Sequence, residues 1–155
     1  MLVFANREES PNRPSTVPEK IPSPTPQGHW LGGGDLTAGG KWLGVNRTGL
    51  IVAVTNRKKS ALPALPQSRG LLCRALLEQG PLDSAEVELH RQWESHQFAG
   101  FNLMLISAER GVIFSADDEV KIQPLTPGQH AITHRDWDDP ADKRLARVRG
   151  LVQEF

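Results

Sequence analysis

The stretch Lys41–Thr55, KWLGVNRTGLIVAVT, has the clearest strand pattern in the sequence. Trp42–Val45 and Leu50–Thr55 are rich in apolar and β-branched residues, as strands are. The four residues between them, Asn46–Gly49, have the composition of a turn. The stretch therefore predicts two β-strands separated by a short turn.

Helical patterns follow this pair of strands. Ser68 can cap a helix that continues through Gln79 and is stopped by Gly80–Pro81. Asp83 followed by Glu86 resembles a capping box, which predicts a second helix to about residue 95. The apolar stripe of this second helix is formed by Val87, Leu89 and Trp93.

The remaining sequence predicts more strands and a last helix. Phe101–Ala108 and Gly111–Ser115, joined by two polar residues, are typical of a hairpin. Val120–Leu125 and His130–Thr133 are weaker strand candidates. Pro140 suits the first turn of a final helix, whose apolar face is formed by Leu145, Val148, Leu151 and Val152.

Strands and helices thus occur in runs rather than in strict alternation, which favours an α+β fold over a doubly wound parallel sheet. Two layers of sheet covered by helices would bury every predicted apolar face. Residues 1–155 are short enough for a single domain. Leu2–Ala5 resembles the end of a buried strand. Residues 10–40 contain six prolines up to Pro26 and then two glycine runs, so we predict a long loop there.

Composition excludes several classes of function. Eighteen basic residues balance eighteen acidic ones, which argues against a dedicated nucleic-acid binder. No apolar run approaches the roughly 18–20 residues of a membrane span. A single cysteine excludes an internal disulfide and a multi-cysteine zinc site. These features are typical of a soluble cytoplasmic protein.

Charge is unevenly distributed along the chain. Residues 36–77 contain seven basic residues and no acidic one, whereas residues 78–155 contain fourteen acidic and eight basic residues. Such asymmetry is typical of an anion-facing surface, and equally of surface charge that only solubilises the chain. Both interpretations remain open from sequence.

Three motifs invite a chemical interpretation and do not support it. Gly32–Asp35 and Gly39–Lys41 follow prolines and precede a strand, whereas a phosphate-binding loop lies between a strand and a helix. His130 and His134 are four residues apart but not in a helical pattern, so they do not form a helical metal site. Cys73 lies in an apolar helix stripe, which indicates a buried structural thiol. We therefore predict no catalytic residue and no metal ligand.

A polar cluster follows the first predicted strand. Four consecutive polar residues, Asn6–Glu9, lie where that strand ends, and a second arginine, Arg13, follows shortly after. Arginine donates a planar fork of hydrogen bonds that suits a carboxylate. The cluster could line a ligand-binding cleft, or it could form a buried ion-pair network that anchors the long loop. The residues alone favour neither.

Six blocks of sequence occur in a characteristic order: Phe4–Glu9 with Arg13–Pro14, Ala38–Gly44, Leu50–Asn56, Ser68–Gly70, Ala99–Leu103 and Leu125–Gly128. Together they resemble the NRDE family, also called the transport and Golgi organisation 2 family. The first block, FANREE, is similar to the Asn-Arg-Asp-Glu signature, with Glu8 in place of aspartate. The third and fifth blocks resemble family strands that end in Thr-Asn and begin with Gly-Phe-Asn-Leu.

The resemblance implies the αββα sandwich of N-terminal nucleophile hydrolases, in an incomplete form. Family members begin with Met-Cys, whereas Met1 of this chain falls in what resembles the second family strand. We therefore expect the first strand and part of the C-terminal portion to be missing. Such enzymes need an N-terminal thiolate and a free α-amine, and Leu2 supplies no thiol, so we do not expect amide hydrolysis by this chain.

The resemblance implies a non-enzymatic role in intracellular ligand handling, such as haem trafficking, with a small anionic and apolar ligand. An amide hydrolase with an N-terminal cysteine is one alternative, and a role in Golgi or secretory organisation is another. Arg7 and Arg13 would bind the propionates of haem, and Trp30 and Trp42 would supply apolar contacts. The candidate cleft is formed by Asn6, Arg7, Glu8, Glu9, Arg13, Gly39, Gly40, Trp42, Asn56 and Arg69.

Overall fold

The fold was determined as a computed structural model, which describes residues 3, 5, 12–26 and 28–152, with the side chains of 151 and 152 left aside. Within these residues, seven strands form one antiparallel sheet in chain order. The strands are β1 (Glu19–Pro22), β2 (His29–Gly32), β3 (Leu43–Asn46), β4 (Ile51–Asn56), β5 (Phe101–Ile106), β6 (Gly111–Ala116) and β7 (Val120–Leu125). The helices are α1 (Arg69–Leu77), α2 (Leu82–Ser95) and α3 (Lys143–Val152).

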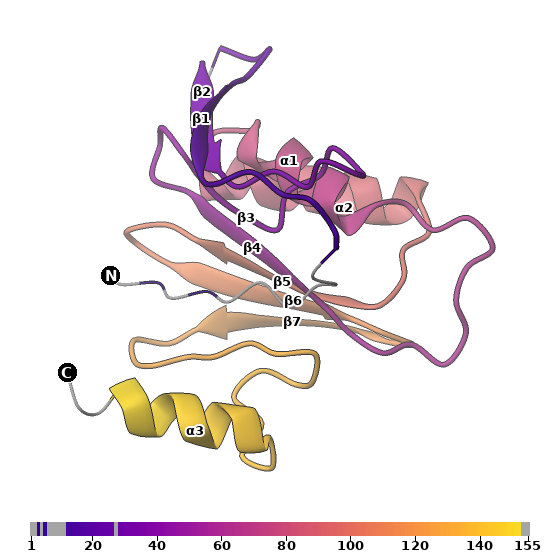
Figure 1. The fold of residues 1–155 in the computed structure, drawn as a ribbon, viewed down its shortest axis with the longest axis vertical. Helices are drawn as coiled ribbons and strands as arrows, with labels where there is room; N and C mark the ends of the chain where they lie inside the picture. Colours follow the sequence, from indigo (N-terminus) through magenta and orange to yellow (C-terminus); the bar gives the residue numbers. More distant parts are fainter. Residues whose placement is uncertain (1–2, 4, 6–11, 27, 153–155) are drawn as a thin grey trace.

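Helices α1 and α2 lie together on one side of the sheet, and α3 lies beside β7 (Figure 1). The two helices connect β4 to β5, which pair directly, so that Val52 faces Leu105 and Thr55 faces Asn102. Side chains alternate between the two faces of a strand. The core therefore forms between the helices and every second residue of the central strands, and it contains Trp30, Val52, Val54, Leu72, Leu76, Leu77, Leu89, Phe98, Phe101, Leu103, Leu105 and Phe114.

The predicted α+β class and most predicted elements are confirmed. The structure forms strands at both runs of the opening stretch and at the hairpin that begins at Phe101. Ser68 is the N-cap of α1, and its side chain accepts a hydrogen bond from the Leu71 N–H. Among the described helices, none is both long and apolar enough to cross a bilayer.

The predicted loop over residues 10–40 is wrong in its middle, where β1 and β2 form a hairpin. The prolines of this stretch led us to predict a loop, because proline lacks the N–H that a central strand donates. β1 is the edge strand of the sheet, and an edge strand tolerates proline where that N–H would face solvent. Pro22 is the last residue of β1. The predicted strand at Leu2–Ala5 lies largely outside the described residues.

The start of α2 differs from the predicted capping box. The helix begins at Leu82, so Asp83 lies inside it and Pro81, whose side chain has no acceptor, is the N-cap. Asp83 and Glu86 both accept hydrogen bonds from Arg110 instead. Val87, predicted in the apolar stripe, is 71% exposed. The buried face of α2 consists of Leu82, Ala85 and Leu89, spaced by three and four residues as a helical face requires.

Two further predictions at the C-terminal end need correction. His130–Thr133 forms no strand, because its polar groups bond to a loop and to the sheet instead. Val148 is 46% exposed although Leu145 of the same predicted stripe is buried, and the side chains of Leu151 and Val152 lie outside the described part. The described residues form a single β-sheet, rather than the two layers of sheet that the sequence predicted.

Candidate functional site

Two glycines bring the segment before β3 against the first turn of α1. A Cβ atom on Gly40 would lie 2.7 Å from the Gly70 Cα atom, and one on Gly70 would lie 2.9 Å from the Gly40 Cα atom. Only a residue without a Cβ atom allows backbones to approach so closely. The Lys41 N–H donates to the Gly70 carbonyl over 2.9 Å, which fixes the two segments. We call this contact the glycine junction.

Asp35 organises the turn that leads into the glycine junction. Its carboxylate accepts hydrogen bonds from the backbone N–H groups of Thr37 and Ala38, and its own N–H donates to the Gly40 carbonyl over 3.0 Å. Arg13 donates to Asp35 Oδ2 over 2.5 Å. This guanidinium contact, with the two N–H donors, lowers the pKa of Asp35 below its usual value. The pairing supports the alternative in which Arg13 anchors the long loop.

Arg57, directly after β4, binds two carboxylates from distant parts of the chain. Its Nε donates to Asp117 Oδ2 over 2.6 Å, its Nη2 donates to Asp136, and its Nη1 lies 3.5 Å from Asn102 Oδ1. The Arg57 side chain is only 11% exposed. Burial disfavours the charged guanidinium, but the two carboxylates outweigh this and raise the pKa of Arg57. We call these four residues the arginine hub.

Asn102 connects the sheet to the chain that follows β7. It is fully buried in β5, on the face opposite the helices because its neighbour Leu103 belongs to the core. Its amide nitrogen donates to the carbonyls of Thr133, over 3.0 Å, and Arg135, over 2.7 Å. Thr55 Oγ1 donates to the same Thr133 carbonyl. These bonds hold residues 126–142, which we call the return segment, against the sheet.

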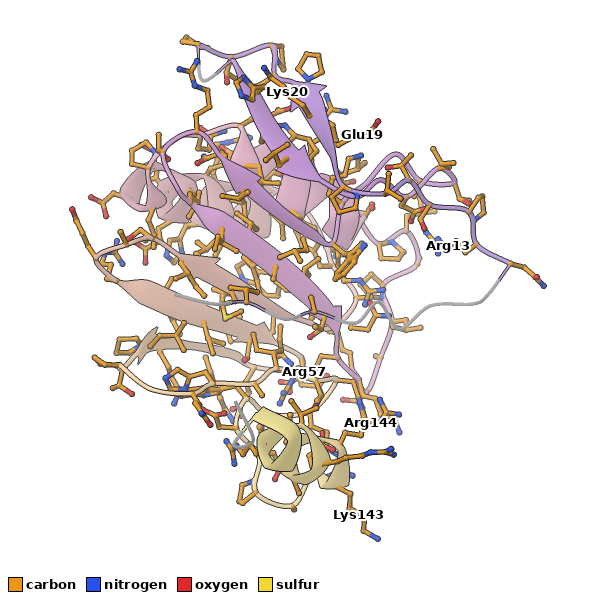
Figure 2. The ribbon with its side chains drawn as sticks, turned by 60° about the vertical axis from the view of Figure 1, so that its left-hand side comes forward. Arg13, Glu19, Lys20, Arg57, Lys143 and Arg144 are labelled. Atoms are coloured by element: carbon orange, nitrogen blue, oxygen red, sulfur yellow. The ribbon has the colours of Figure 1, made fainter. Side chains whose placement is uncertain are left out.

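The glycine junction and the arginine hub meet at Gly100. Its carbonyl accepts from the Arg57 N–H over 2.9 Å and from Arg69 Nη1 over 2.8 Å. Arg69 directly precedes Gly70 in α1, so α1 is held to the hub through one carbonyl. Arg57 lies on the side of the sheet that faces α3, and Arg13 lies apart from it (Figure 2).

A hollow of about 290 Å³ lies beside the arginine hub. Asp139, one of its walls, pairs with Arg135 at 3.6 Å and accepts from the Ala141 N–H. Among the described residues, Lys58 and His134 line the hollow without forming a hydrogen bond or an ion pair. Its carboxylates are therefore engaged, whereas the Lys58 ammonium has no such partner among the described residues, and His134 interacts with the Asp142 carboxylate only through space. The hollow is lined by Arg57, Lys58, Asp117, His134, Arg135, Asp136 and Asp139.

A second hollow, of about 180 Å³, lies at the opposite end of the strands, where the turn after β5 meets α2. Its arginine, Arg110, is bound by Asp83 and Glu86. That group lies at the surface, and its members satisfy one another. The hollow beside the arginine hub is therefore the better candidate for a binding site.

Cys73 does not have the surroundings of a nucleophile. It is fully buried in α1, and its Sγ lies 3.8 Å from the Val52 carbonyl. Burial raises the pKa of the thiol well above its usual value, which keeps it protonated. Among the described residues, no group of three or more histidine, cysteine, aspartate or glutamate side chains could hold a metal ion.

The structure places the predicted cleft residues in several environments. Arg13, Gly39 and Gly40 belong to the turn around Asp35, and Arg69 reaches the Gly100 carbonyl. Trp42 packs against the core, and Asn56 is exposed at the end of β4. None of these six lines the hollow beside the hub. Asn6, Arg7, Glu8 and Glu9 lie outside the described residues.

Comparison with known sequences places the chain in a family. The sequence profile of the family "Transport and Golgi organisation 2" matches residues 1–154. The chain belongs to this family. The Transport and Golgi organization protein 2 homologues of Bos taurus and Homo sapiens are 29% and 28% identical to it over 148 residues, which cover 90% of this chain and 52% of each relative. The Mus musculus homologue is 28% identical over 162 residues, covering 99% and 57%.

The chain thus spans about half the length of the transport and Golgi organisation 2 relatives that it matches. The match confirms the family expected from the six sequence blocks. Sequence reasoning left two residues at these blocks out of the cleft: Asn102 lies within the fifth block, and Arg57 directly follows the third. A buried asparagine within an apolar strand was the available signal.

Proposed function

We propose that this chain handles a small anionic ligand, such as haem, without covalent chemistry, and holds an acidic group of that ligand in the hollow beside the arginine hub. The observation that carries the proposal is the Lys58 ammonium, which has no hydrogen bond or ion pair among the described residues, in a hollow whose carboxylates already have partners. An ammonium group that is not paired gains a charge-assisted hydrogen bond when a carboxylate arrives.

The rest of the hub supports this role by being fixed beforehand. Arg57 is held by two carboxylates and by the Gly100 carbonyl, so it gives the hollow a rigid floor. A site that is already ordered loses less conformational entropy on binding. The ligand therefore meets a fixed wall on one side and the exposed side chain of Lys58 on the other.

The fit to haem is limited to its propionates. Sites that enclose a whole drug-sized ligand span roughly 300–1,000 Å³, and this hollow has about 290 Å³ and polar walls. Trp30, expected to contact the macrocycle, is 1% exposed and belongs to the core. Leu62 and Leu65, 72% and 91% exposed between β4 and α1, offer apolar surface on the segment that begins at the hub. The macrocycle would lie outside the hollow.

The test is a fluorescence titration with protoporphyrin IX, which has the propionates of haem and no iron, and with its dimethyl ester. We expect the acid to bind and the ester to bind at least tenfold more weakly, because the ester cannot form the charge-assisted bond, worth roughly 1.5–3 kcal/mol. Haem itself should follow the acid. Equal binding of acid and ester would refute recognition of an acidic group.

Two lysine variants locate the site. Lys58→Ala should weaken binding of the acid about tenfold, from the loss of one such bond. Lys59→Ala is the matched control, because Lys59 Nζ lies 3.5 Å from the Phe98 carbonyl and does not line the hollow. Equal loss in both variants would mean general charge attraction. Arg13→Ala tests the cleft that was predicted from the sequence. A loss of binding confined to that variant would indicate that the ligand binds in that cleft instead.

The hydrolase alternative would need a cysteine at the true N-terminus. Cys73 does not meet this need, because it lies buried in α1 and burial raises the pKa of its thiol. The relatives' names refer to transport and Golgi organisation. For this chain such a role is a further alternative that no contact in the site supports. A cytoplasmic location stays a prediction from composition.

A further inference from the structure

His130 has a hydrogen-bond acceptor at each ring nitrogen. Nδ1 lies 2.6 Å from Asp138 Oδ2, and Nε2 lies 2.7 Å from the Thr126 carbonyl oxygen. A neutral imidazole has one N–H and one bare nitrogen, so it could donate only one of these bonds. A carboxylate and a carbonyl oxygen can only accept. The arrangement therefore requires the imidazolium form, in which both nitrogens donate.

Asp138 is the centre of this group. Its backbone φ is +53°, in the left-handed region that aspartate tolerates better than most residues. Its Oδ1 accepts from the Ala131 N–H over 2.9 Å and from Arg149 Nη2 of α3 over 2.7 Å. The carboxylate thereby joins two parts of the return segment, at residues 130–131 and at residue 138, to each other and to α3.

Among the residues that the structure describes, the charged groups that face the His130 ring are Asp138 and, from α3, Arg149. The neutral Trp137 ring lies 5.2 Å away between centroids. Burial disfavours the imidazolium, and Arg149 does so by like charge. The bonds to Asp138 and to the Thr126 carbonyl outweigh both and raise the pKa of His130.

The return segment carries much of the hollow. It supplies His134, Arg135, Asp136 and Asp139 to the walls. It also supplies the carbonyls that Asn102 binds. Whatever fixes the return segment therefore fixes one side of the hollow.

We infer that protonated His130 is a latch that closes the return segment onto itself, and that loss of its proton removes one of its two bonds and loosens both the segment and the wall of the hollow. The latch stands on its own contacts. Its effect on a ligand rests on the proposed function.

The direction of the pH dependence follows from linkage. A histidine whose pKa is higher in the folded state stabilises that state fully below the unfolded pKa of about 6.5. This contribution is lost as the pH rises through the folded pKa. The return segment should thus be tightest in mildly acidic solution and should open as the pH rises above neutrality.

The experiment is amide hydrogen exchange of the full chain from about pH 5 to about pH 9, with the ring titration of His130 followed by NMR, across the range in which histidine changes charge. Once the intrinsic pH effect is removed, opening of residues 126–142 should increase about tenfold or more, as expected from one lost bond to a charged partner. Exchange in β4 and β5 should stay unchanged. If the protection of the return segment did not change with pH between about 5 and 9, the latch would be refuted.

Two variants give the result its meaning. His130→Gln has no proton to lose near neutrality, so its opening should not depend on pH, while His96→Gln, at an exposed histidine after α2, should behave like the parent chain. Asp138→Asn keeps the backbone preference and removes the charge, which provides a second test if His130→Gln unfolds. A pH-dependent His130→Gln would refute the latch. Absence of protoporphyrin binding at every pH would refute only the proposed ligand.

Discussion

Gly70→Ala is expected to destabilise the chain even though it replaces glycine by the best helix former. Gly70 lies in the first turn of α1, and alanine in a helix is favoured over glycine by about 1 kcal/mol. Here the new Cβ atom would lie 2.9 Å from both the Gly40 Cα and the Lys41 nitrogen. Both are backbone atoms, which cannot turn away as a flexible side chain would.

The expected loss follows from two opposing effects. Overpacking of this kind costs about 1–3 kcal/mol, and movement of the backbone also weakens the bond from the Lys41 N–H to the Gly70 carbonyl, worth about 1 kcal/mol. After the gain in helix propensity, a net loss of about 1–3 kcal/mol in the free energy of unfolding remains. This lowers the melting temperature by roughly 2–4 °C per kcal/mol at this size.

Gly150→Ala is the matched control for this substitution. Gly150 also lies in a helix, α3, and a Cβ atom there meets nothing within 4 Å. The same change should therefore stabilise the chain by up to about 1 kcal/mol. Urea unfolding of both variants measures the two effects on one scale. If Gly70→Ala were as stabilising as Gly150→Ala, the glycine junction would not constrain the backbone as described.

Two further predictions concern buried and exposed groups. Arg57→Ala should lower the free energy of unfolding, measured in urea, by about 1.5–3 kcal/mol, because bonds to charged partners are lost where the side chain is only 11% exposed. Arg110 also binds two carboxylates but is 45% exposed, so Arg110→Ala should change the free energy of unfolding little. Equal losses in the two variants would contradict this reasoning. Cys73 should react with a thiol reagent only as fast as the chain unfolds, since its thiol is buried and protonated; rapid labelling of the native protein would refute this.

The elements that could be predicted are those whose local pattern and environment agree. β4 and β5 are apolar runs in the centre of the sheet, and the α1 cap needs only Ser68 and the turn after it. β1 could not be predicted, because whether proline is tolerated depends on whether the strand lies at the edge. The predicted capping box of α2 was wrong also because of a distant contact. Arg110, which lies on another element, binds the Asp83 and Glu86 carboxylates that the box would use.

The arginine hub could not be predicted from local sequence, because its ion pairs join Arg57 to residues 60 and 79 positions later. Each of these residues alone is typical of a solvated loop. Asn102 was the one local signal, since a buried amide in an apolar strand must find partners. The uneven charge along the chain was a partial signal for these ion pairs. Arg57 and Lys58 belong to the basic region of the sequence, and Asp117 and Asp136 belong to the acidic one.

The return segment is fixed from two sides by contacts that differ in their response to pH. On the sheet side, Asn102 donates to two carbonyls, and an amide does not titrate. On the other side, His130 can donate to both Asp138 and the Thr126 carbonyl only while it is charged. Loss of the proton therefore removes one of these two bonds and leaves the bonds of Asn102 in place, so the segment should loosen without leaving the sheet. A graded change in the hollow, rather than unfolding, is what this combination of contacts produces.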